Sequence, residues 1–254
     1  MSGTLARESF GRQARTLAAA AVFHDRDVLE VLVRSAAHGP GRRCIDVGCG
    51  PGIVLEALAR HGGEVVGVDV TPEMVQLAQE RCRKARLENV RVQVGPGETL
   101  PFPDGHFDSA VTRTVLHHVQ DPHVVLAEMT RVVRPGGRMV IADIVSSDVS
   151  AESDLQNALE IIRDPSHVHM LPRADFLKLG ESHGLRFIDR REWVHHRELE
   201  EWLKIANAPE RAGPLRVVMT SLAQAGCQAG MELKCTENRI TFEHHLWMLV
   251  LEKP

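Results

Sequence analysis

The stretch Ile45-Asp46-Val47-Gly48-Cys49-Gly50-Pro51-Gly52 predicts how this chain folds. Its beginning, together with Arg43 and Cys44, is a short apolar run of the kind that forms a buried strand, and residues 53–60 have helical spacing. The glycines permit a tight turn and the close approach of a ligand to the backbone. The stretch therefore predicts a strand, a ligand-binding turn and a helix, which together form a unit of an open α/β sheet.

The order of the glycines narrows the class of ligand expected at this turn. A dinucleotide site normally has the order G-x-G-x-x-G and holds a pyrophosphate, whereas this chain has G-x-G-x-G. Asp46 would repel a pyrophosphate but attract an ammonium group, and Asp69, about 20 residues further on, suits ribose hydroxyls. The pattern favours a cofactor that carries an amino acid. The alternative is that both acids cap helices and the glycines form only a turn.

Strand-like and helix-like segments alternate over residues 41–145, which predicts a largely parallel sheet covered by helices on both faces. The pattern changes after Ser146. We expect a single domain over residues 1–254, in which residues 1–40 form a helical cap and residues 41–145 a cofactor-binding core. Two further segments, residues 146–184 and 195–240, are expected to form a helical lid at the carboxyl edge of the sheet, where such sheets bind ligands.

Apolar runs predict the individual strands at residues 43–48, 64–69, 90–94, 107–112, 138–145, 185–194 and 242–251. Helical spacing predicts the helices at residues 53–60, 72–87, 151–162, 173–183, 199–206 and 215–225. A further helix after the fourth strand is expected to break at Asp121-Pro122 and to end at Val133, because Pro135-Gly136-Gly137 follows it.

Composition limits the class of protein. The chain has 254 residues, 43% of them apolar, which is enough to bury a sizeable core. The net charge of -4 disfavours nucleic acid and anionic membranes as partners, and the apolar runs are too short to span a bilayer. The five cysteines include no C-x-x-C pair, so neither a disulfide framework nor a zinc site is indicated. We expect a cytoplasmic protein with reduced thiols.

Four stretches give the chain a resemblance to a known family. They are Ile45–Gly52, Leu100–Asp104 with Phe107-Asp108, Leu116-His117-His118, and Arg131–Gly137. In these the chain resembles the class I methyltransferases of the ubiquinone/menaquinone-biosynthesis type, also called methyltransferase type 11. The resemblance covers roughly residues 40 to 145 and continues more loosely through residues 163–167.

The resemblance implies a Rossmann-like fold with a seven-stranded, mostly parallel sheet whose last strand is antiparallel. It implies S-adenosyl-L-methionine as the cofactor and methyl transfer to a small organic acceptor. The resemblance implies that Asp46, Gly48, Cys49 and Gly50 surround the methionine part of the cofactor and that Asp69 binds the ribose. It implies that Val70, Met74, Gly97 and Glu98 lie around the adenine, and that Arg113 and His118 lie near the sulfonium.

The adenine end departs from the family pattern. The family usually has Gly-Asp-Ala where this chain has Gly95-Pro96-Gly97. Pro96 offers neither a carboxylate nor an N–H group. We therefore expect adenine to be held by backbone groups alone or by Glu98.

A histidine and an aspartate are the candidate catalytic pair. Methyl transfer to an alcohol or phenol requires removal of a proton, for which a histidine near its neutral pKa is the natural base. His117 follows the fourth expected strand and Asp143 lies in the fifth, so the two are expected to be neighbours. They match a histidine and an aspartate that some natural-product O-methyltransferases of the family use. The alternative is that His117 packs inside a helix and Asp143 caps a loop.

Phe10, Gln13, Arg163 and His167 are candidates for contact with the acceptor. The alternatives are core packing for Phe10 and Gln13 and a turn around Asp164 for the other two. His167 and His169 stand two residues apart, as metal ligands on a strand can, but no convincing partner set accompanies them, so no metal is expected.

We favour O-methylation because a histidine base is available. The alternatives are a C- or N-methyltransferase of quinone or natural-product biosynthesis, a repurposed enzyme that keeps the cofactor but catalyses a cyclisation, and a non-catalytic module on the same fold. An RNA methyltransferase is disfavoured by the acidic net charge and the lack of a basic arm. The sequence predicts neither the identity of the acceptor nor the oligomeric state.

Overall fold

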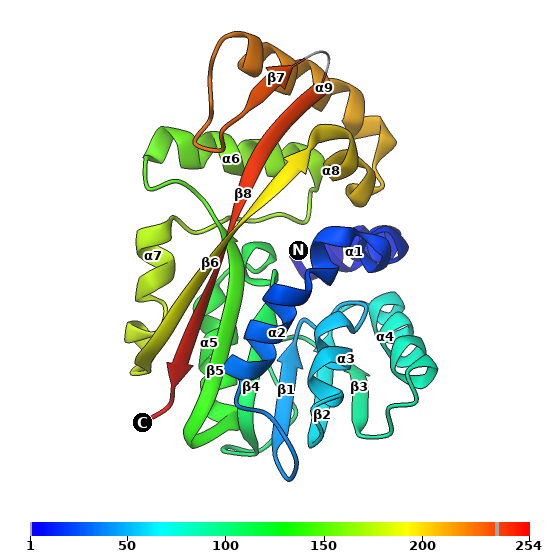
Figure 1. Ribbon diagram of the computed structural model, residues 1–254, viewed down its shortest axis with the longest axis vertical. Coiled ribbons are helices and arrows are strands. Elements are labelled where there is room, and N and C mark those ends of the chain that lie inside the picture. Colours follow the sequence, from blue (N-terminus) through cyan, green and yellow to red (C-terminus); the bar gives the residue numbers. More distant parts are fainter. Residues whose placement is uncertain (1, 237–238) are drawn as a thin grey trace.

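An eight-stranded mixed sheet runs through the protein (Figure 1), seen in a computed structural model that describes residues 2–236 and 239–254. Its strands are β1 (Arg43–Val47), β2 (Glu64–Asp69), β3 (Val90–Val94), β4 (Phe107–Arg113), β5 (Val133–Val145), β6 (Arg186–Glu198), β7 (Lys234–Thr236) and β8 (Arg239–Glu252). Their order is β3-β2-β1-β4-β5-β8-β6, with β7 also paired to β8. Strands β1 to β5 are parallel, and β8 is antiparallel to β5, β6 and β7.

Helices occupy both faces of the sheet and its carboxyl edge (Figure 1). The α-helices are α1 (Ser2–Ala19), α2 (Arg26–Ser35), α3 (Ile53–Ala59), α4 (Pro72–Lys84), α5 (Pro122–Val132), α6 (Ser150–Arg163), α7 (Arg173–Lys178), α8 (Leu199–Ala206) and α9 (Pro209–Gln224). Short 3-10 helices are η1 (Ala21–His24), η2 (Leu116–His118) and η3 (Glu181–His183).

Two hydrophobic cores hold these layers together because side chains on a strand alternate between the faces of a sheet. In β1, Cys44 belongs to the core formed with α2, α3 and α4, whereas Ile45 belongs to the core formed with α5 and α7. Leu55 of α3 and Met129 of α5 are fully buried, one in each core. The sheet is therefore covered on both faces, as a parallel sheet requires.

A third core lies beyond the carboxyl edge of the parallel strands. The long strands β6 and β8 extend past that edge, and α6, α8, α9 and β7 gather around their ends (Figure 1). Trp202 of α8, Leu215 of α9 and Phe242 of β8 are almost completely buried there. Helix α1 crosses between this upper part and the parallel strands, with contacts to both α4 and α8. The carboxyl edge is thus enclosed by a separately packed layer.

The predicted Rossmann-like methyltransferase fold is confirmed, with one strand more than the expected seven. Strands β2 and β3 have the predicted bounds. The extra strand is β7, whose three residues are all exposed, so no apolar run marks it. Because of β7 and the end of β6, the segment 195–240 is not wholly helical.

Several other elements differ from the expectation: α7 ends at Lys178 instead of 183, and α9 begins at Pro209 instead of 215. Helix α5 ends at Val132, and Pro135-Gly136-Gly137 belongs to β5. The reason is that Gly136 donates its N–H to the carbonyl of Lys253 at 2.7 Å and Gly137 accepts from the N–H of Lys253 at 3.0 Å, which continues the sheet. Within the expected cap, α2 packs on the face of the sheet beside α3.

None of the helices in the described ranges, 2–236 and 239–254, combines the length and the apolar character needed to cross a membrane.

The glycine turn provides a matched pair of stability tests. Gly50 and Gly52 both have positive φ, +51° and +80°, but a Cβ on Gly52 would lie 2.9 Å from Cα of Ala78 in α4, whereas Gly50 has open space around it. We expect Gly50→Ala to lower the free energy of unfolding by about 1–2 kcal/mol through backbone strain alone. Gly52→Ala should cost roughly 1–3 kcal/mol more through the clash. Urea unfolding measures both, and equal losses would contradict the packing argument.

Candidate active site

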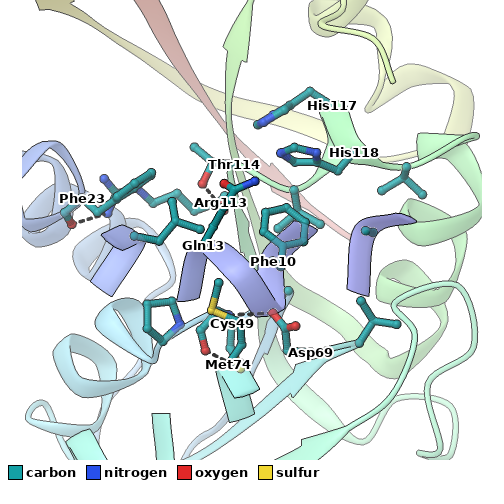
Figure 2. A pocket seen from close by; sticks show the side chains of 18 of the residues that line it. Phe10, Gln13, Phe23, Cys49, Asp69, Met74, Arg113, Thr114, His117 and His118 are labelled. Carbon is teal, nitrogen blue, oxygen red and sulfur yellow. Dashed lines mark hydrogen bonds between the residues drawn. The ribbon is translucent and has the colours of Figure 1, made fainter. Parts of the chain in front are cut away.

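A cavity of about 460 Å³ lies at the carboxyl ends of β1, β2 and β4, under α1 and α8. This size is in the range of small-molecule sites. In Figure 2, His117 and His118 lie next to one another at one end of the cavity, and Asp69 and Met74 lie at the other. Phe10 of α1 lies beside His118, with ring centroids 4.6 Å apart. The cavity therefore joins the predicted cofactor turn to the predicted catalytic histidine.

The glycine turn is fixed by backbone bonds and by Asp69. The N–H groups of Gly48 and Cys49 donate to the carbonyl of Val68, which ties the turn to β2. Asp69 Oδ2 accepts the N–H of Gly50 at 2.8 Å, and Oδ1 accepts the N–H of Thr71 at 2.8 Å. Burial raises the pKa of Asp69, although both N–H groups oppose this. Each oxygen keeps a second lone pair that can accept a hydrogen bond from a hydroxyl group.

Asp46, at the end of β1, is the exceptional carboxylate of the cavity. Its side chain is 1% exposed, and within the described chain its Oδ2 has no hydrogen-bond partner. Burial and the nearby Asp69 raise the pKa of Asp46 to about 8, against a smaller opposing effect of Arg113. An uncompensated buried carboxylate is costly. The site is therefore suited to a cationic group that would bind next to Asp46.

At the opposite end, the cavity is lined by Val70, Met74, Gly97 and Glu98. Met74 is buried, whereas Glu98 is exposed. Pro96 also lines this end. A flat apolar group would pack between Val70 and Met74, with Glu98 at the solvent-exposed margin.

His117 and Asp143 form a buried pair in the wall of the cavity. His117 Nδ1 lies 2.5 Å from Asp143 Oδ1. The carboxylate also accepts the N–H groups of Leu116 at 2.7 Å and Ile144 at 2.8 Å. Burial disfavours the charge on His117, but Asp143 outweighs burial, so the pKa of His117 is raised. Burial would raise the pKa of Asp143, but His117 and the N–H donors lower it.

His118 belongs to a different hydrogen-bond chain. Its Nδ1 lies 3.1 Å from Ser166 Oγ, Ser166 Oγ donates to Asp164 Oδ1 at 2.7 Å, and Gln13 Nε2 donates to Asp164 Oδ2 at 2.7 Å. Burial and the neighbouring His117 lower the pKa of His118 to about 3. The chain joins α1, the loop after α6 and η2, and it leaves the His118 ring neutral at physiological pH.

Of the remaining residues predicted to contact the acceptor, some line the cavity and one does not. Arg163 lies in the wall, paired with Glu160 at 2.9 Å and 4.9 Å above the ring of Trp202. His167 is not among the residues that line the cavity, and its Nε2 instead bonds to Asn157 Oδ1 at 2.8 Å. Gln13 lines the cavity, but its amide is engaged by Asp164.

Arg113, at the end of β4, holds the N-terminal segment in place. It donates to the carbonyls of Phe23 at 3.1 Å and Val22 at 3.4 Å, as Figure 2 shows for Phe23. Burial lowers the pKa of Arg113 to about 10, opposed by Asp25 and Asp46, so it remains charged. Its charge lies close enough to Asp46 to balance it in part.

Several lining residues were not among the predicted site residues. They come from α6, β6, α8 and β8 and are Glu160, Arg197, Ile205, His195 and His244. His244 Nε2 is 3.1 Å from Glu160 Oε1, although their orientation does not make a hydrogen bond. No motif marks these positions. For Glu160, Arg197, His195 and His244, the only indication in the sequence is a polar or charged residue within an otherwise amphipathic helix or strand.

In the described part of the chain, no three or more His, Cys, Asp or Glu side chains are arranged to hold a metal ion.

Comparisons of the sequence and of the structure with known proteins both point to methyltransferases. Residues 45–141 match the family described as "Methyltransferase domain". The uncharacterized methyltransferase YcgJ of Bacillus subtilis is 29% identical over 220 residues, which are 87% of this chain and 86% of YcgJ. The crystal structure of YcgJ has a TM-score of 0.82 at 27% identity, covering 89% of this chain and 97% of that one.

Two other proteins are similar over part or most of the chain. The O-methyltransferase cnsE of Penicillium expansum is 34% identical over 173 residues, which are 67% of this chain and 61% of cnsE. A geranyl diphosphate methyltransferase in complex with S-adenosylmethionine has a TM-score of 0.64 at 21% identity, covering 95% of this chain and 90% of its own, and shares the fold.

The fold and the acidic glycine turn define a class I methyltransferase. The match of residues 45–141 to a methyltransferase domain and the similarity to YcgJ over most of the chain indicate an S-adenosylmethionine-dependent methyltransferase.

The buried Asp46 predicts how stability without ligand depends on pH. Its pKa is raised from 3.8 to about 8, so the folded protein holds a proton that the unfolded chain releases, and stability falls as pH rises through this window. Asp46→Asn removes this dependence. We expect its melting temperature, relative to wild type, to be higher at pH 8.5 than at pH 5.5. The exposed Asp154→Asn is the control. If the difference in melting temperature between Asp46→Asn and wild type were the same at both pH values, the pKa of Asp46 would not be raised by burial.

Proposed function

We propose that this enzyme transfers the methyl group of S-adenosyl-L-methionine to an oxygen of a small organic acceptor, with His117 as the general base and Asp143 as the residue that orients it. The observation that carries the proposal is the His117–Asp143 pair, 2.5 Å apart and buried in the wall of the cavity that contains the glycine turn. The name of the relative cnsE, an O-methyltransferase, supports an oxygen acceptor.

The cavity fits the proposed cofactor at three points. The carboxylate of Asp46, which lines the cavity, suits the ammonium of an amino-acid group, next to Gly48, Cys49 and Gly50. Asp69 has lone pairs to spare for ribose hydroxyls. Val70 and Met74 would pack against adenine, with Gly97 and Glu98 at its edge. Pro96 offers no N–H, so we propose that adenine is recognised there by Glu98 and by backbone groups.

The cofactor, when bound, supplies a methyl group on a sulfonium, which is electrophilic without help from the protein. The protein must then place the acceptor oxygen in line and remove its proton. His117 Nε2 takes that proton, because Nδ1–H is engaged by Asp143. Asp143 holds the tautomer and stabilises the positive imidazolium that results, as a carboxylate does for histidine in hydrolytic triads. Phe10 and α8 cover part of the cavity and so limit the access of water and other nucleophiles.

Cofactor binding tests the first half of the proposal. Calorimetry should show that the wild type binds S-adenosylmethionine, and that Asp46→Asn binds it about 10- to 100-fold more weakly, because a charged hydrogen bond to the ammonium is lost. Asp154→Asn, on the exposed face of α6, should bind like wild type. Absence of wild-type binding at millimolar cofactor would refute the assigned cofactor site.

The catalytic pair has a pH signature. His117→Ala should lower kcat roughly 10²- to 10⁴-fold with cofactor binding retained. Since Asp143 raises the pKa of His117 above 6.5 and only the unprotonated ring accepts a proton, kcat/KM should rise with pH through a value above 6.5. Asp143→Asn should shift this limb to lower pH and reduce the plateau.

The same shift should appear in the absence of acceptor. Titration of ¹⁵N-labelled His117 by NMR should give a lower pKa in Asp143→Asn than in wild type. An unchanged pKa, or full activity of His117→Ala with any hydroxyl acceptor, would contradict the pair as catalytic machinery.

A further inference from the structure

Two imidazole rings, rather than one, are available to an acceptor in the cavity. The ring centroids of His117 and His118 are 4.2 Å apart, at an angle of 46°, and both residues line the cavity. Each ring is held through its Nδ1, by Asp143 for His117 and by Ser166 for His118. Neither Nε2 has a partner among the described residues, and neither is one of the sealed, unpartnered polar atoms of the interior. Both Nε2 atoms therefore remain accessible from the cavity.

The hydrogen-bond chain behind His118 determines which of its nitrogens carries the proton. Asp164 accepts only, because His118, Arg163 and its other neighbours lower its pKa to about 2 despite its burial. Ser166 has one hydroxyl proton and donates it to Asp164 Oδ1 at 2.7 Å. The oxygen of Ser166 is thus left to accept, so His118 must donate from Nδ1–H. The lone pair of His118 is then on Nε2.

The two rings differ in what they can do with a hydroxyl. The pKa of His117 is raised by Asp143, so its Nε2 can take a proton, whereas the pKa of His118 is about 3, so its Nε2 accepts a hydrogen bond without taking the proton. A single hydroxyl would leave one of the two Nε2 acceptors without a hydrogen bond from the substrate, whereas a second hydroxyl would supply it.

We propose that the acceptor carries hydroxyl groups on two neighbouring carbon atoms, as in a catechol, and that His118 binds the hydroxyl that is not methylated while His117 deprotonates the other. The proposal rests on the function proposed above. The hydroxyl at His117 loses its proton to Nε2, its oxygen forms the new C–O bond, and the C–S bond to the methyl group breaks with its electron pair left on sulfur. The neighbouring hydroxyl keeps its proton, so the product is a monomethyl ether.

Ser166, Asp164 and Gln13 are positioning residues in this proposal, since they act on the acceptor through His118. Gln13 donates to Asp164 Oδ2 at 2.7 Å from α1, so the N-terminal helix also supports the selected tautomer. Phe10 packs edge-on against the His118 ring and limits its rotation.

The test compares matched acceptors: catechol with phenol, and 2,3-dihydroxynaphthalene with 2-naphthol. In wild type, we expect kcat/KM for each dihydroxy compound to exceed that of its monohydroxy partner by at least about five- to tenfold, the effect of one hydrogen bond to a buried group. His118→Phe keeps an aromatic ring against Phe10 but removes the nitrogen, and should reduce the ratio to near one, chiefly through KM. His123→Phe, an exposed histidine at the start of α5, is the matched control and should retain the ratio.

The tautomer provides a readout that does not need an acceptor. ¹⁵N NMR of wild type at neutral pH should show His118 protonated on Nδ1, and Ser166→Ala should shift His118 toward the other tautomer and lower the preference for dihydroxy acceptors. Equal kcat/KM for the paired acceptors in wild type, or His118 protonated on Nε2, would overturn the proposal while O-methylation stands. Failure to methylate any hydroxyl acceptor would overturn the proposed function, and this inference with it.

Discussion

The carboxylate of Asp143 organises the end of the cavity at which His117 lies. It receives backbone N–H groups from both sides, from Val115 and Leu116 on one strand-to-helix turn and from Ile144 on its own strand. With these donors it stays ionised although it is buried. The same carboxylate then holds His117, and the carbonyl of His117 accepts the N–H groups of Val168 and His169 in the loop after α6. One charge therefore positions the turn, the histidine and, through that histidine, the loop that contains Ser166.

The half of the cavity around the glycine turn could be predicted from the sequence because its elements are local. The glycine turn, the acids Asp46 and Asp69 and strands β2 and β3 each depend on residues within a few positions of one another. The His117–Asp143 contact could also be predicted, because β4 and β5 are adjacent parallel strands, so a residue just after the end of β4 lies near one close to the end of β5. In these places chain order and spatial order agree.

The rest of the site depends on contacts that are distant in sequence. Gln13 and Asp164 are 151 positions apart, so nothing local announces their hydrogen bond. His167 was expected to face the acceptor, but its ring turns to Asn157 in the preceding helix. The wall formed by Glu160, Arg197 and His244 depends on β6 and β8, which extend past the parallel strands. Each of these two strands is as long as its pairing with the other allows, and this length cannot be seen from either segment alone. Likewise, the first part of β5 continues the sheet because Lys253, the residue after β8, bonds to Gly136 and Gly137.

The separate packing of the upper layer has an evolutionary consequence. The core around Trp202, Leu215 and Phe242 shares no residue with the two cores of the parallel sheet, yet its helices supply one wall of the cavity. A substitution there can reshape that wall while the glycine turn and its acids keep their support. The family match ends at residue 141, before this layer begins. Selection can thus change the molecules that such an enzyme accepts at small risk to the glycine turn, because the two parts pack in separate cores.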